Sequence, residues 1–455
     1  MSDRSTRGQL EFPNQASSVR HLVLVGMTSS VVVAYLTRTV LAPASSVIQR
    51  ELSLTNLEMG AVHGVWAFGY VGFQLPGGWL GDRFGRRVIL PLYGVLWSVC
   101  TLWTAQASTF AELWWSRLIF GAAQAGLVPC LTRACFDWFP EDSRGWASAA
   151  ITAGMSAGAV IASGLAAFLI PVLGWRLSCQ LFALSGILWA IEFWRIFRDR
   201  PEIHPRVNRA ELELIRKPTV LSLPSDPSAQ LSPSVTIERP TSGGVPSPWG
   251  ALQIYGLLAL FLLAFQAMCR TFCYNFLTTW FPTFLERGLG ANLRNAGLMT
   301  MLPLAGYVGG AMIGGVLIDR LLRATRSKWK SRSGVAATAL LVAAAGSVAA
   351  IFTPALEVAL LVLAIGAAAS GLASPATWAA AMDLGGRSSA TVMGIVNMTG
   401  NLGAFLCPLA VGAILDATGD RWNLVLLMFA GVSLAGALSW VFLDPQRPLR
   451  LGDRV

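Results

Sequence analysis

Uninterrupted runs of about twenty apolar residues recur along this chain and constrain its fold more than any other feature, because a helix of that length crosses the hydrocarbon core of a bilayer. Charged residues make up only 13% of the chain, whereas soluble domains carry about 25%. A chain so poor in charge can cover its surface only with lipid. The pattern therefore predicts a polytopic membrane protein.

The apolar runs predict an all-α membrane protein of twelve transmembrane helices, in two pseudo-symmetric six-helix bundles around a central cavity. The expected spans are 21–43, 57–80, 88–107, 111–139, 146–170, 177–197, 250–285, 295–322, 334–353, 356–382, 389–415 and 421–443. Residues 198–248 are polar and rich in proline and serine, so they are expected to form a flexible cytoplasmic linker. The expected domains are an N-terminal tail (1–20), the first bundle (21–197), this linker, the second bundle (249–443) and a C-terminal tail (444–455).

Basic residues are shared unevenly between the loops on the two sides of the membrane. One side collects the linker arginines and Arg4, Arg7, Arg20, Arg83, Arg86, Arg87, Arg320, Arg323, Arg326, Lys328, Lys330, Arg332, Arg447, Arg450 and Arg454. The opposite loops hold Arg50, Arg176, Arg287, Arg294 and Arg421. Because basic loops stay in the cytoplasm, both termini are expected there, in a cell (inner) membrane. The net charge of +10 thus needs no nucleic-acid partner.

The two halves of the chain repeat one another. Gly77-Gly78-Trp79-Leu80-Gly81-Asp82-Arg83 ends the second expected span, and Gly314-Gly315-Val316-Leu317-Ile318-Asp319-Arg320 ends the eighth at the same offset. Two related halves with a site near the midplane are a common plan of transporters. The seven cysteines lie in apolar runs without a Cys-x-x-Cys pair, so neither a disulfide framework nor a metal site is indicated. No cofactor is expected.

A loop motif carries a family resemblance. The stretch from Gly78 to Arg87, Gly-Trp-Leu-Gly-Asp-Arg-Phe-Gly-Arg-Arg, resembles the signature loop of the major facilitator superfamily. Within it, the chain is similar to the anion:cation symporter family, which includes galactonate and hexuronate carriers, sialin and the vesicular glutamate transporters. Matching stretches are Tyr35-Leu36-Thr37-Arg38, Gln74-Leu75-Pro76-Gly77-Gly78, Trp138-Phe139-Pro140-Glu141-Asp142-Ser143-Arg144, Gly174-Trp175-Arg176, Trp280-Phe281-Pro282 and Asn397-Met398-Thr399-Gly400-Asn401. They cover nearly every span and exclude the linker.

Three arginines, Arg38, Arg117 and Arg270, lie inside apolar spans and away from their expected ends. Each costs about 2.5–3.5 kcal/mol on insertion scales, so such residues usually serve a function. A guanidinium group grips a carboxylate through two parallel hydrogen bonds. We expect the three to bind an anionic substrate, the role that the resemblance implies for arginines at these positions. Snorkelling, or a bond to a backbone carbonyl, is the alternative. Arg133, one turn from Asp137, is instead expected to form a local ion pair.

The resemblance also implies proton-coupling carboxylates at two positions where this chain has Thr37 and Gln124. Neither side chain exchanges a proton in a useful range, so proton symport through carboxylates is not expected. Transport driven by the membrane potential or by another coupling cation stays open. His63 could titrate near neutral pH and is the candidate for a replacement coupling group, with a packing role as its alternative.

Polar side chains on otherwise apolar spans are further candidates for the cavity lining. They are Tyr70, Gln124, Tyr274, Trp378, Asn397 and Asn401, with Trp66 as a second stacking face. Hydroxyl and amide groups suit a polyol chain, and unpaired in hydrocarbon they would be costly. The two asparagines could equally hold helices together.

Asp82 and Asp319 end the second and eighth spans and are expected to act in gating. A carboxylate is stabilised beside a helix N-terminus. Asp82 is expected to meet the start of the eleventh span, near Ser388 and Ser389, and Asp319 the start of the fifth, with the loop arginines Arg83, Arg86 and Arg87 beside them. Solvated loop charges are the alternative.

The sequence thus indicates a monomeric secondary transporter that moves a small organic anion, such as a sugar acid or another carboxylate, by alternating access. An exporter of cationic or neutral compounds would want acidic residues at mid-membrane. A transporter-like sensor would want a folded cytoplasmic output module. An enzyme is the weakest reading, because the sequence shows neither a nucleophile–base pair nor a metal-binding cluster.

Overall fold

The computed structural model describes residues 16–216, 251–353, 355–385 and 389–445. Within them all regular structure is helical, and ten helical stretches are long and apolar enough to cross a membrane. One of these breaks at Gly174, whose φ of 74° is a backbone conformation that glycine adopts without strain, so it makes two crossings. The helix Asn56–Phe84, which glycines and polar residues make less apolar, adds the remaining crossing. The expected all-α fold with twelve crossings is confirmed.

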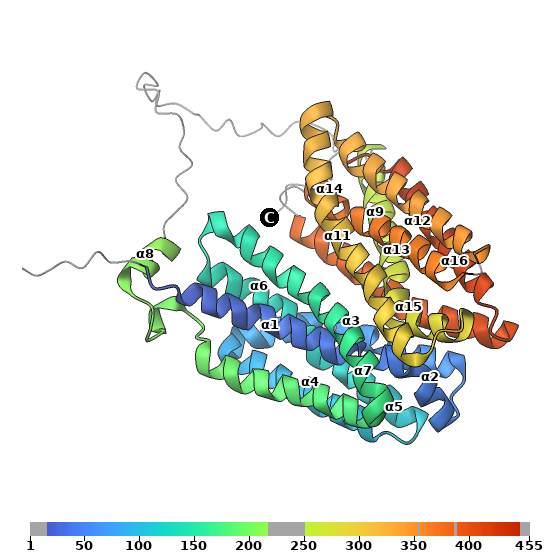
Figure 1. Ribbon diagram of the computed structural model, residues 1–455. Coiled ribbons are helices and arrows are strands. Elements are labelled where there is room, and N and C mark those ends of the chain that lie inside the picture. Colours follow the sequence, from blue (N-terminus) through green and yellow to red (C-terminus); the bar gives the residue numbers. More distant parts are fainter. Residues whose placement is uncertain (1–15, 217–250, 354, 386–388, 446–455) are drawn as a thin grey trace, which may run out of the picture.

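The crossings are built from the following elements. In the first bundle they are α1 (Val19–Thr39) with α2 (Leu41–Leu52), α3 (Asn56–Phe84), α4 (Arg86–Gln106), α5 (Phe110–Ala125) with α6 (Leu127–Trp138), and the two parts of α7 (Glu141–Ile196). In the second they are α9 (Ala251–Thr279) with α10 (Phe281–Thr283) and a π-helix (Phe284–Gly288), α11 (Leu293–Thr325), a π-helix (Trp329–Gly334) with α12 (Val335–Ile351), α13 (Leu356–Leu372) with α14 (Ser374–Gly385), α15 (Ser389–Thr418) and α16 (Trp422–Phe442). Figure 1 shows the two bundles side by side.

The first, fourth, seventh and tenth crossings are broken helices, whereas the apolar runs predict continuous ones. In each, the second segment carries a proline in its first turn: Pro43, Pro129, Pro282 and Pro375. Proline lacks the backbone N–H that would bond the carbonyl four residues earlier, and its ring crowds that carbonyl, so the helix stops there and a new one starts. Irregular backbone at membrane depth is tolerated where protein buries it or where it lines a cavity. The breaks therefore point to the region between the bundles.

The bundles touch mainly through two pairs of helices, α3 with α15 and α7 with α11, and also through α2, which contacts α9, α10 and α11. A methyl group added at Gly60 of α3 would lie 2.3 Å from the Pro408 carbonyl oxygen of α15, and one at Gly412 of α15 would lie 2.3 Å from the Asn56 carbonyl oxygen. Further along the same helices, Gly72 and Gly394 have nothing within 4 Å of that position. We call the end with α2 and α10 the closed end and the end with α8 (Arg209–Arg216) the open end, toward which the bundles diverge (Figure 1).

Part of the segment expected to be a flexible linker is folded. It contains a 3₁₀-helix (Pro201–Ile203) and α8, and it packs on the start of α1. The buried Glu211 carboxylate accepts hydrogen bonds from the backbone N–H groups of Val19 (3.2 Å) and Arg20 (3.0 Å). The first N–H groups of a helix have no partner within the helix, so this carboxylate caps α1 from outside. Residues 217–250 lie outside the described residues.

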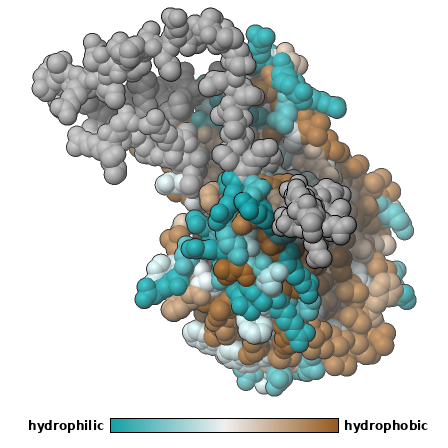
Figure 2. Space-filling view, turned by 90° about the vertical axis from the view of Figure 1, so that its left-hand side faces the viewer, coloured by the Kyte–Doolittle hydropathy of each residue, from teal (hydrophilic) through white to brown (hydrophobic). Residues whose placement is uncertain are grey.

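The surface agrees with a membrane position. Figure 2 looks at the molecule from the side of α8 and shows hydrophilic residues gathered on this face, with hydrophobic residues along the flanks. Exposed leucine, valine and phenylalanine side chains are numerous on the helices of both bundles. Such extensive apolar exposure suits contact with lipid and would be unusual for a soluble domain.

Candidate substrate site

Arg38 lies at the end of α1, directly before the break. Its Nε and Nη2 groups both donate to Oε1 of Gln124, at 3.1 and 2.8 Å. The Gln124 amide nitrogen in turn donates to the Ala34 carbonyl at 2.9 Å, which fixes the orientation of the amide. The Thr37 hydroxyl donates a hydrogen bond to the Ala34 carbonyl oxygen at 3.0 Å. Arg38 is therefore held in place by a neutral side chain, which does not offset its positive charge.

Three aromatic rings surround the Arg38 guanidinium. Its carbon atom lies 4.2 Å from the ring centre of Trp66, 4.5 Å from that of Tyr35 and 5.5 Å from that of Tyr70. Ring faces attract a cation without neutralising it. Trp66 and Tyr70, both expected in the cavity lining, thus pack against the Arg38 guanidinium. This guanidinium is half-buried and remains available to an anion.

Arg117 occupies a different environment from Arg38. It is 2% exposed, and its Nη2 group donates to the Arg38 backbone carbonyl at 3.1 Å. Its guanidinium lies 4.1 Å from the ring centre of Phe120, and its Nε and Nη1 atoms have no hydrogen-bond partner among the described residues. A cation at the C-terminal end of α1 interacts favourably with the helix dipole. In this conformation Arg117 supports the segment that carries Arg38 and adds positive potential behind it.

Arg270, on α9, is the cationic residue of the second bundle. Its Nη1 group donates to the Tyr307 hydroxyl at 2.7 Å, and the Tyr307 ring centre lies 4.6 Å from that of Tyr274. The Tyr274 hydroxyl lies within electrostatic range of both Arg38 and Arg270. The two arginines, one from each bundle, therefore both act on the same residue, Tyr274. Sequence reasoning missed Tyr307, although it is a lone polar aromatic residue in the glycine-rich α11.

Within the part of the chain that the structure describes, the site has no compensating negative charge. The ion pairs within 4.0 Å among the described residues include none that involves Arg38, Arg117 or Arg270. Charges withdrawn from water are costly unless paired. A negatively charged ligand would supply the missing partner.

Among the described residues, the remaining expected lining residues make no hydrogen bond or ring contact with Arg38 or Arg270. Trp378, on α14, is 56% exposed. On α15, Asn397 is exposed, and the Asn401 amide donates to the Asn397 carbonyl at 2.9 Å. His63 is buried toward the closed end, with Nε2 2.8 Å from the Ser45 hydroxyl and its ring edge-on to Trp280 of the second bundle. Its contacts are those of a packing residue between the bundles.

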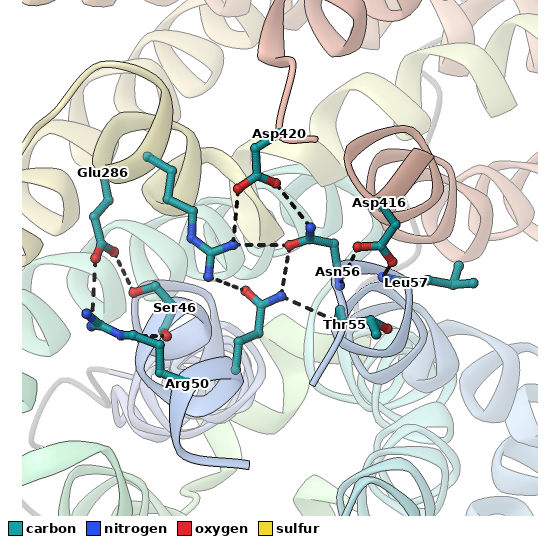
Figure 3. A network of polar contacts seen from close by, with 10 residues as sticks. Ser46, Arg50, Thr55, Asn56, Leu57, Glu286, Asp416 and Asp420 are labelled. Carbon is teal, nitrogen blue, oxygen red and sulfur yellow. Dashed lines mark hydrogen bonds and ion pairs between the residues drawn. The ribbon is translucent and has the colours of Figure 1, made fainter. Parts of the chain in front are cut away.

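A polar network joins the bundles at the closed end (Figure 3). Arg287 donates from Nη1 to the Asn56 side-chain oxygen at 3.1 Å and from Nη2 to the Gln49 side-chain oxygen at 2.9 Å, and it lies 3.9 Å from Asp420. The Asp416 carboxylate accepts from the backbone N–H groups of Asn56 at 3.0 Å and Leu57 at 2.8 Å. Asp416 thereby caps α3 from the opposite bundle.

A second group of contacts extends this network. Glu286 accepts a hydrogen bond from the Ser46 hydroxyl and lies 4.0 Å from Arg50, so α2 is tied to the π-helix after α10. Sequence reasoning missed both groups, because polar residues in short loops are ordinarily solvated. Within the described residues, the hydrogen bonds and ion pairs between the bundles lie at this end.

The expected gating residues lie at the open end. The Asp82 side chain is 69% exposed and 3.9 Å from Arg86, whose main partner is Asp137 at 2.6 Å. The Arg87 backbone N–H donates to Asp199 at 3.0 Å, and the Arg83 guanidinium lies 5.7 Å from the Trp79 ring centre.

Asp319 is exposed. The proposed partner of Asp82 falls partly outside the described residues, which omit Ser388 and the side chain of Ser389. The expected local pair of Arg133 with Asp137 is present at 3.5 Å.

Comparison with known proteins identifies the class. The family model of the Major Facilitator Superfamily matches residues 27–391 and 296–454. The chain belongs to this superfamily, a family of transporters and not of enzymes. It is 27% identical to a probable sulfoacetate transporter of Cupriavidus necator, with 95% of each chain covered. It is 29% identical to the D-galactonate transporter of an Escherichia coli strain, covering 93% of this chain and 95% of that one.

Solved structures show the same fold. A bacterial homologue of the human lysosomal transporter Spinster, in an inward-facing and unoccupied conformation, matches with a TM-score of 0.68 at 21% identity, over 94% of this chain and 95% of that chain. A D-xylose–proton symporter matches with a TM-score of 0.71 at 14% identity, over 94% and 99%. Both support the arrangement of two bundles.

Proposed function

We propose that this protein is a secondary transporter that moves a small organic anion across the membrane by alternating access, acting as a monomer. The observation that carries the proposal is the pair Arg38 and Arg270, one guanidinium from each bundle, without a paired carboxylate among the described residues. The relatives named for sulfoacetate and galactonate transport support an anionic substrate.

We further propose that the open end faces the cytoplasm, together with both termini. The basic residues Arg83, Arg86, Arg87, Arg320 and Arg323 lie at this end, and basic loops stay in the cytoplasm. In that orientation the structure is the inward-open state, and the closed-end network is the shut extracellular gate. Asp82 and Asp319 would form their contacts with the opposite bundle only after the open end closes.

Coupling to a proton through carboxylates is not part of this proposal. Thr37 and Gln124 occupy the two relevant positions, and both are neutral hydrogen-bonding groups engaged with α1. The membrane potential or a coupling cation then supplies the driving force. His63 is the remaining candidate for a titrating group.

The test is uptake of labelled galactonate, glucarate and sulfoacetate into proteoliposomes. Arg38→Ala and Arg270→Ala should each lower uptake at least about tenfold, because a charge-assisted hydrogen bond contributes about 1.5–3 kcal/mol. Arg323→Ala removes an exposed arginine of the open end and serves as the matched control. Equal uptake by the wild type and both cavity variants, or transport of neutral hexoses alone, would refute the proposal.

A further inference from the structure

Two arginines converge beside the last turn of α7, at the open end of the first bundle. Arg87, near the start of α4, donates from Nε to the Trp194 carbonyl oxygen at 3.4 Å, and Arg198 donates from Nη1 to the same oxygen at 3.4 Å. Burial, and after it the positive charge of Arg87, lowers the pKa of Arg198 below its ordinary value. Two like charges are thus held close together by one carbonyl group.

This pair of arginines has no carboxylate partner among the described residues. The ion pairs within 4.0 Å involve neither Arg87 nor Arg198, although Glu192 and Asp199 lie nearby in the sequence. Asp199 instead accepts from the Arg87 backbone N–H at 3.0 Å and so caps α4. The Nη1 and Nη2 groups of Arg87 and the Nη2 group of Arg198 have no hydrogen-bond partner in this part of the chain, and none of them is among the buried unpaired atoms. Donors therefore remain for an outside acceptor.

The arginine pair lies at the edge of an apolar outer surface. α4 packs within the first bundle, mainly on α7 and α5. Trp194 is 52% exposed, and the Arg87 guanidinium carbon lies 5.0 Å from its ring centre. Large apolar side chains are exposed at helical spacing along α4 and along the part of α7 after its break: Val88, Leu92, Val95, Val99, Leu181, Leu184, Leu188 and Ile191. Tryptophan at the headgroup level, with basic groups beside it and apolar side chains below, is the arrangement in which a protein meets a lipid headgroup.

We propose that Arg87 and Arg198 bind the phosphate group of an anionic phospholipid, whose acyl chains lie along the exposed faces of α4 and α7. Phosphate oxygens suit guanidinium groups because each oxygen can accept from a planar pair of N–H donors. The net charge of an anionic lipid offsets an arginine charge, whereas the cationic group of a zwitterionic lipid would be repelled by the second arginine. A free anion would gain the polar contacts alone and leave the apolar surface unused.

This lipid site is separate from the substrate site and does not depend on which anion is transported. If the open end faces the cytoplasm, as proposed above, the lipid belongs to the inner leaflet. There it would hold the segment after α7 against the start of α4, where Asp199 already caps the helix.

The test is native mass spectrometry of the full-length protein with phosphatidylglycerol and phosphatidylcholine that carry the same acyl chains. The wild type should bind phosphatidylglycerol about tenfold more tightly, the factor expected of two arginines near a membrane surface. Arg87→Gln with Arg198→Gln should remove this preference. Arg209→Gln with Arg323→Gln removes two exposed arginines from the same end and is the matched control, expected to keep the preference.

The single variant Arg87→Gln leaves the Arg198 contacts at the end of α7 in place, so it reports on the site even where the double variant does not fold. It should weaken phosphatidylglycerol binding about threefold to fivefold. Equal binding of the two lipids by the wild type, or an equal loss in the control pair, would overturn the lipid site. Glycerol phosphate carries the charge without acyl chains. If it displaced phosphatidylglycerol at equal concentration, the site would be one for a soluble anion and the lipid would be refuted as its occupant.

Discussion

Removing Arg287 should open the closed end. Its guanidinium donates to Asn56 and Gln49 of the first bundle, and its side chain is 24% exposed, so water replaces these bonds only in part. Hydrogen bonds from a charged group contribute about 1.5–3 kcal/mol each when buried. Allowing for the exposure, Arg287→Ala should weaken the closed state by about 2 kcal/mol in total. That corresponds to a shift of about 30-fold in the ratio of the two conformations.

The assay is a distance measurement by electron paramagnetic resonance between spin labels at positions 172 and 423, on α7 of the first bundle and α16 of the second, at the closed end. Val172 is 80% exposed and Asn423 is exposed, so labels there should disturb neither bundle. Arg287→Ala should increase the population with a long distance between the labels. Arg421→Ala removes a neighbouring exposed arginine and is the matched control.

Two results would contradict the reasoning about Arg287. One is an unchanged distance distribution in a folded Arg287→Ala variant. The other is an equal shift in Arg421→Ala, which would mean that general charge at this end governs the closure.

Three further predictions concern separate contacts. Asp416→Ala should populate the state open at the closed end about threefold to tenfold more, whereas Asp416→Asn should do so less because an amide oxygen still caps α3; the same labels report this. Gln124→Glu should pair with Arg38 and raise the substrate Kd about tenfold, measured by calorimetry. His204 follows the 3₁₀-helix, with its Nε2 atom 3.0 Å from the Ile196 carbonyl oxygen, and burial lowers its pKa below the usual 6.5. The neutral ring therefore stabilises the folded chain above that pH, and melting temperatures should fall below it in the wild type and less in His204→Gln.

The sequence was sufficient for the number of crossings and the division into two bundles, because hydropathy over a span is a local property. It also carried an unused signal for the helix breaks. Four prolines lack the backbone N–H group that would continue the hydrogen bonds of the helix across each break: Pro43, Pro129, Pro282 and Pro375. Read at equivalent positions of both halves, these four prolines would have predicted discontinuous helices beside the cavity.

The partners within the site could not be predicted from sequence alone. Gln124 stood out as a replaced carboxylate, but its bond to Arg38 joins residues 86 positions apart. The closed-end bonds join residues up to 364 positions apart. Nothing local distinguishes Arg287 from a solvated loop arginine, and nothing distinguishes Arg117, buried behind Arg38, from an arginine that lines a cavity. These assignments depend on how the bundles meet, which hydropathy does not encode.

The neutral pairing of Arg38 has a consequence for substrate release. A carboxylate beside this arginine would compete with the substrate for its charge and could exchange places with it. Gln124 leaves the charge of Arg38 unchanged throughout the cycle, so release has to come from geometry. When the bundles separate at the open end, an anion held by both Arg38 and Arg270 loses one of its contacts, and its affinity falls with the number of arginines it can still reach. The separation of Arg38 from Arg270 thus releases the substrate, a step that would otherwise need a side chain that changes its protonation state.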